Sequence, residues 1–177
     1  VTLTQETDFP NTGDVRLTVA TDAPKALTLH LRIPAWVEDA VEVSINGDPV
    51  EYPAAKGTYL ELSRTFSDGD VIDTRLPMSL RLESMPDNAD RVAIMYGPIV
   101  LGGALGTEGL PEGGAYADSD VAFSEEPTPD VPVLVADRGR LKEWVKPLAG
   151  DPLTFHTVGA GQPADVVLKP FYRIHHE

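Results

Sequence analysis

Two neighbouring carboxylates, Glu125 and Glu126, are the side chains in this sequence best suited to acid–base chemistry. Cleavage of a glycosidic bond uses one carboxyl group as an acid and a second as a base or nucleophile. Adjacency in sequence does not establish the separation that this reaction needs. The pair also lies in a stretch rich in glycine, proline and acids, whereas catalytic groups need a rigid supporting shell. We therefore assign no catalytic residue to the chain.

A second group that could do chemistry is His175, His176 and Glu177, whose side chains are of metal-binding types. Adjacent side chains of a strand point to opposite faces, so they cannot easily chelate one ion. A frayed terminus explains these residues better than a zinc site.

Asp118, Asp120 and Asp130 are oxygen donors of the kind that calcium prefers. They lack the ligand order of an EF-hand loop. A solvated acidic loop is the favoured interpretation, and we assign no metal ligand.

The two tryptophans are candidate binding residues. Trp36 could stack on the apolar face of a sugar ring, which makes it the one candidate for ligand binding. It follows Pro34 directly after an apolar strand, and large aromatic side chains are usually interior, so packing at the edge of a sandwich is the favoured role. We expect Trp144 to anchor a short helix to a sheet.

Composition excludes several classes of function. The formal net charge of −14 opposes binding to nucleic acid or to an anionic membrane. The chain has no cysteine, so it has no thiolate nucleophile, no disulfide and no cysteine-ligated zinc. Val1 begins directly in a strand-like sequence without an initiator methionine or a signal-peptide pattern, which predicts a fragment of a longer protein. A bacterial cytoplasmic location is our expectation.

The first hundred residues alternate between apolar and polar side chains, as strands with one buried face do. The pattern covers residues 15–19, 27–33 and 41–45, and Asn46-Gly47 then predicts a tight type I′ hairpin. The more apolar stretch 91–101 predicts a central strand, either continuous or broken at Gly97-Pro98. These patterns predict an antiparallel β-sandwich, jelly-roll-like, whose core contains Leu29, Leu31, Val43, Ile45, Val92 and Ile94.

The rest of the chain is organised differently. Between residues 104 and 137 there are eight acids and no lysine or arginine, which predicts an exposed loop. Order should resume at 131–135, and residues 138–145 should form the one short helix, with Leu141, Trp144 and Val145 on one face. The expected division is a sandwich at 1–103, an acidic Gly/Pro-rich excursion at 104–130, and a C-terminal segment at 131–177 that packs on or completes the sandwich.

Four segments together resemble one known family: RIPAWVEDAVEVSINGDPV, GTYLELSRTFSDGDVIDTRLPM, RVAIMYGPIVL and LKPFYRIHHE. They are similar, in this order, to the region that follows the catalytic domain in glycoside hydrolase family 127, the β-L-arabinofuranosidase-like family. The resemblance implies an (α/α)6-barrel catalytic domain upstream of Val1, with a cysteine nucleophile and zinc held by cysteine and glutamate. None of those cysteines has a counterpart in this chain.

The expected function is therefore that of a non-catalytic C-terminal β-sandwich domain of a bacterial glycoside hydrolase. Such a domain would support the upstream catalytic barrel and contribute to a homodimer, and the chain itself would be inactive and hold no cofactor. The alternative is a carbohydrate-binding module, which an exposed Trp36 beside hydrogen-bonding groups would favour.

Overall fold

The computed structural model describes residues 1–51, 55–106 and 131–174. These residues form mostly antiparallel strands with one short α-helix, which confirms the predicted all-β class. The chain divides into two compact units, Val1–Ile99 and Val100–Glu177. The predicted acidic excursion at 104–130 falls outside the described residues from 107 onward, so it stays a prediction.

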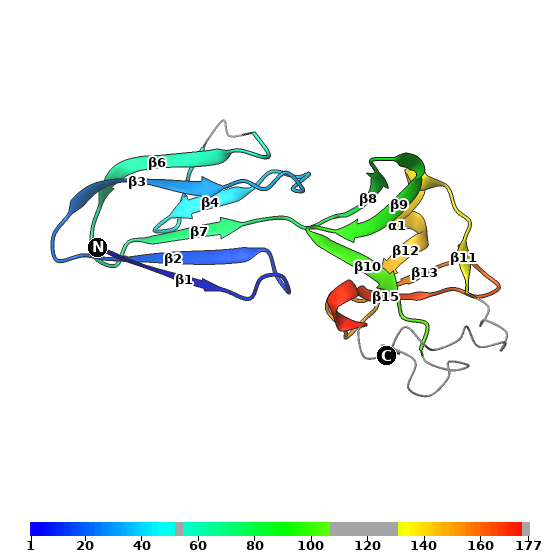
Figure 1. Ribbon diagram of the computed structural model, residues 1–177. Helices are drawn as coiled ribbons and strands as arrows, with labels where there is room; N and C mark the ends of the chain where they lie inside the picture. Colours follow the sequence, from blue (N-terminus) through cyan, green and yellow to red (C-terminus); the bar gives the residue numbers. More distant parts are fainter. Residues whose placement is uncertain (52–54, 107–130, 175–177) are drawn as a thin grey trace, which may run out of the picture. The chain divides into compact units, whose positions relative to one another are not determined.

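Unit 1 contains a five-stranded antiparallel sheet and a two-stranded one (Figure 1). The larger sheet has the order β1-β2-β7-β4-β5, and β3 pairs with β6 along its whole length. The strands of these two sheets are β1 (Thr2–Thr7), β2 (Asp14–Ala20), β3 (Lys25–Arg32), β4 (Glu42–Ile45), β5 (Asp48–Pro49), β6 (Tyr59–Phe66) and β7 (Val71–Arg75).

The core of unit 1 lies between these two sheets. The five-stranded sheet contributes buried apolar residues at alternate positions, as the sequence pattern predicts: Leu17, Val19, Val43, Ile45 and Ile72. From the other layer, β6 contributes Leu60, Leu62 and Phe66. Full burial of one such side chain contributes about 1.5–3 kcal/mol to folding.

Strand β3 covers the same core from beside β6. Leu29 and Leu31 stand opposite Leu62 and Leu60 in the antiparallel register and pack against the buried cluster. The predicted orientation of both leucines is thus confirmed. Among the other predicted core residues, Val43, Ile45 and Ile94 are buried and Val92 is half-buried.

The hairpin between β4 and β5 has the predicted turn. Asn46 and Gly47 have φ angles of 54° and 86°, the left-handed values that a type I′ turn requires at both positions. Ile45 faces Asp48 across the turn, and the Val50 N–H donates to the Val43 carbonyl at 2.8 Å. Asparagine and glycine tolerate this backbone better than other residues, which fixes the turn locally.

A second hairpin in unit 1 joins β8 (Leu80–Met85) to β9 (Asn88–Tyr96). Residues 91–101 do not form one strand, because β9 ends before Gly97 and β10 (Ile99–Gly103) begins after Pro98. The broken form is therefore the correct one of the two predicted alternatives. Gly97 has a φ of 54°, and a Cβ there would lie 2.8 Å from Met78 Sδ, so the break suits glycine.

Unit 2 holds four strands in the order β12-β13-β15-β10 and a separate pair, β11 with β14. Its helical segments are short, and within the part of the chain that the structure describes no helix is long and apolar enough to cross a membrane. The elements after β10 are β11 (Val133–Leu134), the 3₁₀ turn η2 (Arg138–Arg140), α1 (Leu141–Trp144), β12 (Val145–Pro147), β13 (Phe155–Thr157), β14 (Gly161–Gln162), β15 (Val167–Pro170) and the 3₁₀ turn η3 (Phe171–Arg173).

The predicted helix at 138–145 is observed as the 3₁₀ turn η2 followed directly by the four-residue helix α1, and it ends one residue early. Val145 is already the first residue of β12, in keeping with the preference of β-branched side chains for extended backbone. Leu141 and Val145 are buried. The half-buried Trp144 donates its indole N–H to the Asp137 carbonyl at 2.9 Å.

Asp165 organises the loop between β13 and β15. Its carboxylate accepts backbone N–H bonds from Gly161 at 2.9 Å, Gly159 at 2.8 Å and Ala160 at 3.1 Å, and a hydroxyl bond from Thr157 at 2.9 Å. These donors, led by the Gly161 N–H, lower the pKa of Asp165 to about 2. One carboxylate thereby holds the whole turn.

Candidate functional site

A groove of about 910 Å³ lies at one end of the five-stranded sheet in unit 1. It is bounded by the end of β1, the start of β2, the end of β7, the start of β4, and β5. Most of the side chains that line it are polar or charged. Those with a formal charge are Glu6, Asp8, Asp14, Arg16, Glu42, Asp73 and Arg75.

The strand register lines up these groups in rows across the sheet. Arg16 stands opposite Glu6 of β1 on one side and Asp73 of β7 on the other, and Asp73 stands opposite Ser44 of β4. Two residues along, Arg75 stands between Asp14 and Glu42. Positions two apart in a strand share a face, so both arginines have acidic cross-strand neighbours.

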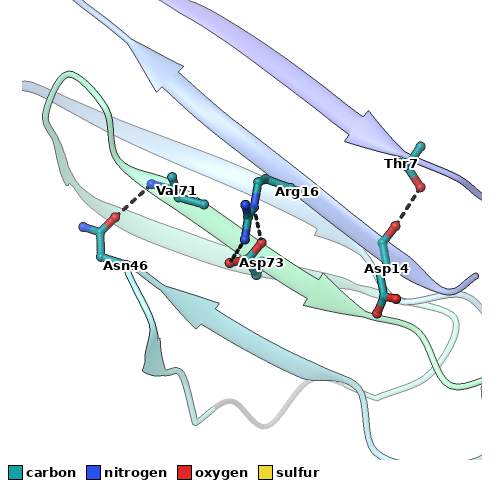
Figure 2. A network of polar contacts seen from close by, with 6 residues as sticks. All are labelled: Thr7, Asp14, Arg16, Asn46, Val71 and Asp73. Carbon is teal, nitrogen blue, oxygen red and sulfur yellow. Dashed lines mark hydrogen bonds and ion pairs between the residues drawn. The ribbon is translucent and has the colours of Figure 1, made fainter.

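The centre of the first row is a two-point ion pair, which Figure 2 shows between β2 and β7. Arg16 Nε donates to Asp73 Oδ1 at 2.7 Å and Nη2 donates to Oδ2 at 3.1 Å. The hydrogen bond and charge of Asp73 raise the pKa of Arg16. This fork geometry fixes both side chains, and it occupies the carboxylate that lies at the middle of the row.

The two ends of the sheet have their own polar links, also drawn in Figure 2. Thr7 donates its hydroxyl to the Asp14 carbonyl at 2.7 Å, which ties the end of β1 to the start of β2. At the other end, Asn46 Oδ1 accepts the Val71 N–H at 2.9 Å. Outside that view, Asn46 Nδ2 donates to Asp70 at 2.8 Å. The strands that carry the groove are thus held in register at both ends.

The groove can bind through hydrogen bonds and is negatively charged. Its acidic side chains exceed its two arginines by three, so it disfavours anionic ligands. Carboxylates accept hydrogen bonds from the hydroxyl groups of a ligand, and arginines donate hydrogen bonds to those hydroxyl oxygens. Within the described residues, no three His, Cys, Asp or Glu side chains form a group that could hold a metal ion.

Phe9, which directly follows a groove residue in the sequence, forms an aromatic pair with Trp36. Trp36 is half-buried in the turn after β3, and Phe9 lies in the loop after β1, one residue beyond the groove residue Asp8. The two rings stack with centroids 6.3 Å apart and planes inclined by 28°. Phe9 is 40% exposed, so the pair is partly open to solvent.

A smaller hollow of about 350 Å³ adjoins the groove, and neither Phe9 nor Trp36 lines either of the two hollows. It is formed largely by the loop that carries Trp36, including Val37 and Glu38, and Lys56 also lines it. It shares Val41 and Val50 with the larger groove. The two hollows therefore adjoin at the same end of unit 1.

The other residues that the sequence analysis considered as sites fall outside the described residues. They are Asp118, Asp120, Glu125, Glu126, Asp130, His175, His176 and Glu177. Arg16, Asp73 and Phe9 were not among the residues that the sequence pattern predicted for a site. The alternation of residues 15–19 places Arg16 on the outer face, but nothing in that pattern identifies its partner 57 residues away.

Comparison with protein families divides the chain near residue 80. Residues 1–78 match the model described as "Beta-L-arabinofuranosidase, GH127 middle domain". Residues 81–177 match DUF4986, described as a domain of unknown function. The two matches together cover almost all of the sequence.

Two of the individual relatives are described as β-L-arabinofuranosidases. A non-reducing end β-L-arabinofuranosidase of Bifidobacterium longum subsp. longum is 28% identical over 97% of this chain, and the chain spans only 28% of that protein's length. A crystal structure of a GH127 β-L-arabinofuranosidase from Geobacillus stearothermophilus T6 is 38% identical, with a TM-score of 0.51, over 56% of this chain and 16% of that one. A solved glycoside hydrolase covers 99% of this chain with a TM-score of 0.63 at 22% identity, over 30% of its own length, which is a likeness of fold alone.

Proposed function

We propose that this chain, which belongs to the DUF4986 family over residues 81–177, is the non-catalytic, β-rich accessory region of a longer glycoside hydrolase of family GH127. The main support for this proposal is the small share of its relative's length that this chain covers. The chain matches the Bifidobacterium enzyme over nearly its whole length, yet it accounts for 28% of that enzyme. The remainder of such a protein is large enough for a separate catalytic domain.

The chemistry of the groove supports a non-catalytic role. Asp73, its central carboxylate, is ion-paired with Arg16 through two hydrogen bonds, and a carboxylate held in this way is a weaker nucleophile than a free one. The zinc site that the family resemblance implies uses cysteine, and this sequence has none. The residues present do not fit that site, and we assign no zinc-dependent step to this chain.

An exposed apolar stripe in unit 2 supports a structural role. Val131, Val133 and Val135 alternate along and beside β11, with exposures of 65%, 61% and 57%. Alternate positions in extended chain share one face, so the three valines form one surface. Such surfaces usually mark contacts with another protein surface. We propose that this stripe contacts the catalytic domain of the same polypeptide. We also propose that the whole region lies C-terminal to that catalytic domain and contributes to a homodimer.

The proposal is tested first by activity. The purified 177-residue chain and a longer polypeptide extended upstream are assayed on an aryl β-L-arabinofuranoside. We expect turnover by the longer polypeptide and none by the chain alone. Turnover by the chain that disappears in Glu125→Gln would overturn the non-catalytic role.

A second test addresses the structural role. Val131, Val133 and Val135 are replaced together by serine, and Phe171→Ala, which changes a 66% exposed side chain, is the matched control. In the longer polypeptide we expect the serine variant alone to lower the melting temperature of the catalytic domain, because the contact loses apolar area. Equal melting of all three proteins would contradict the proposed contact.

A further inference from the structure

The polar groove, the smaller hollow and the aromatic pair all lie at one end of unit 1. Figure 1 shows the loop after β1, the loop after β3 and the end of β7 together at this end of the two sheets. Phe9 directly follows the groove residue Asp8, and Trp36 directly precedes Val37 of the smaller hollow, which shares Val41 and Val50 with the groove. We call this region the loop-end cleft: the residues that line the two hollows, with Phe9 and Trp36 beside them in the chain.

We propose that the loop-end cleft binds a neutral oligosaccharide. Sugars combine an apolar ring face, which suits an aromatic side chain, with hydroxyl groups that both donate and accept hydrogen bonds. Phe9 supplies a partly exposed ring, the carboxylates of Glu6, Asp14 and Glu42 accept, and Arg75 donates. This ligand class fits the mixture of groups better than a purely apolar molecule does.

The charge of the cleft defines the ligand further. Acidic side chains in the groove exceed arginines by three, and the smaller hollow adds Glu38 and Asp39 against Lys56. A sugar with carboxylate, sulfate or phosphate groups would be repelled. The groove volume of about 910 Å³ is near the upper end of the usual range for small-ligand pockets, so a chain of sugars fits better than one ring.

The binding groups are also held in place before any ligand arrives. Trp36 stacks on Phe9 and limits its motion, while the fork between Arg16 and Asp73 fixes the middle of the groove. Thr7 ties the two strands beside it through the Asp14 carbonyl. Groups that are already ordered lose less entropy on binding, which favours affinity. This inference does not depend on the accessory role proposed above.

The test is calorimetric titration of the 177-residue chain with arabinotriose, xylotriose and galactotriose, and with trigalacturonate as the anionic probe. We expect saturable binding of at least one neutral trisaccharide with a Kd of about 1 mM or lower, and none of trigalacturonate. A second readout is the fluorescence of a Trp144→Phe variant, in which Trp36 is the remaining tryptophan. Its emission should change with the same midpoint.

Variants locate the site. Phe9→Ala should raise the Kd at least about threefold through the lost aromatic contact, whereas Phe171→Ala, an exposed aromatic of unit 2, should leave it unchanged. Glu42→Gln, which keeps the shape of an exposed side chain, should also weaken binding and serves if Phe9→Ala does not fold. The inference is overturned if no neutral trisaccharide binds, if trigalacturonate binds more tightly, or if binding is the same in Phe9→Ala and Glu42→Gln as in the parent chain.

Discussion

Arg16 and Asp73 face each other across β2 and β7 and form a two-point ion pair, although 57 positions separate them in the sequence. Both side chains are partly exposed, at 56% and 39%. Water and salt screen exposed pairs, so their effect on stability is small. The pair orders the groove more than it stabilises the fold.

A double-mutant cycle measures this coupling. Arg16→Met and Asp73→Asn, alone and together, are compared by urea unfolding at about 0.05 M and about 1 M sodium chloride. We expect a small favourable coupling at low salt that decreases at high salt. A coupling that does not change with salt would mean that the hydrogen bonds, rather than the charges, connect these residues.

The core prediction concerns Phe66, whose side chain is fully buried between the two sheets of unit 1. Phe66→Ala should reduce the free energy of unfolding by about 3–5 kcal/mol, because it removes apolar contacts and leaves a cavity. The matched control is Phe171→Ala, at a side chain that is 66% exposed, with an expected effect within about 0.5 kcal/mol. Chemical denaturation followed by circular dichroism distinguishes the two. Similar effects would show that Phe66 is not a core residue.

The hairpin prediction concerns Asn46, which combines a positive φ angle with two side-chain hydrogen bonds, to Val71 and Asp70. Asn46→Gly keeps the backbone freedom and loses the hydrogen bonds, at a cost of about 1 kcal/mol. Asn46→Ala also forces a Cβ into the left-handed region and should cost about 1–2 kcal/mol more. Urea unfolding of both variants shows which of them is the less stable. An alanine variant as stable as the glycine variant would contradict the claim that the left-handed backbone at residue 46 disfavours a Cβ.

The pH prediction rests on Asp165. Its pKa is about 2 in the folded chain and 3.8 ordinarily, so it is depressed by folding. A depressed carboxyl pKa stabilises the fold above the ordinary value, and the contribution is lost as the pH falls from about 4 toward 2. Asp165→Asn should therefore be less stable than the parent chain at neutral pH, and the difference should shrink below pH 4.

The measurement is urea unfolding of both proteins between pH 7 and pH 2.5, with Asp151→Asn as a control carboxylate. Asp151 accepts one hydroxyl bond from Thr154 and pairs with Arg173 at 3.7 Å, whereas Asp165 accepts four hydrogen bonds. A stability difference for Asp165→Asn that is the same at every pH would refute the electrostatic explanation.

Local sequence determined much of this fold. The alternation at 15–19, 27–33 and 41–45 assigns each side chain to the buried or the exposed face, because successive residues of a strand point in opposite directions. Asn46-Gly47 determines its own turn, since the two residues tolerate left-handed backbone. These features depend on neighbours in the chain, so the all-β class could be predicted without knowing which strands pair.

The candidate binding surface was decided by tertiary structure. Alternation places Arg16 on the outer face of β2 but does not say that β7 lies beside it, and only the register sets Asp73 opposite. Phe9 and Trp36 meet because the loops after β1 and β3 reach the same end of unit 1. Strand order and register arise from the packing of two sheets around a shared core, which is a property of residues distant in sequence. The sequence by itself therefore determined which face each side chain occupies, and the packed sheets determined which side chains became neighbours.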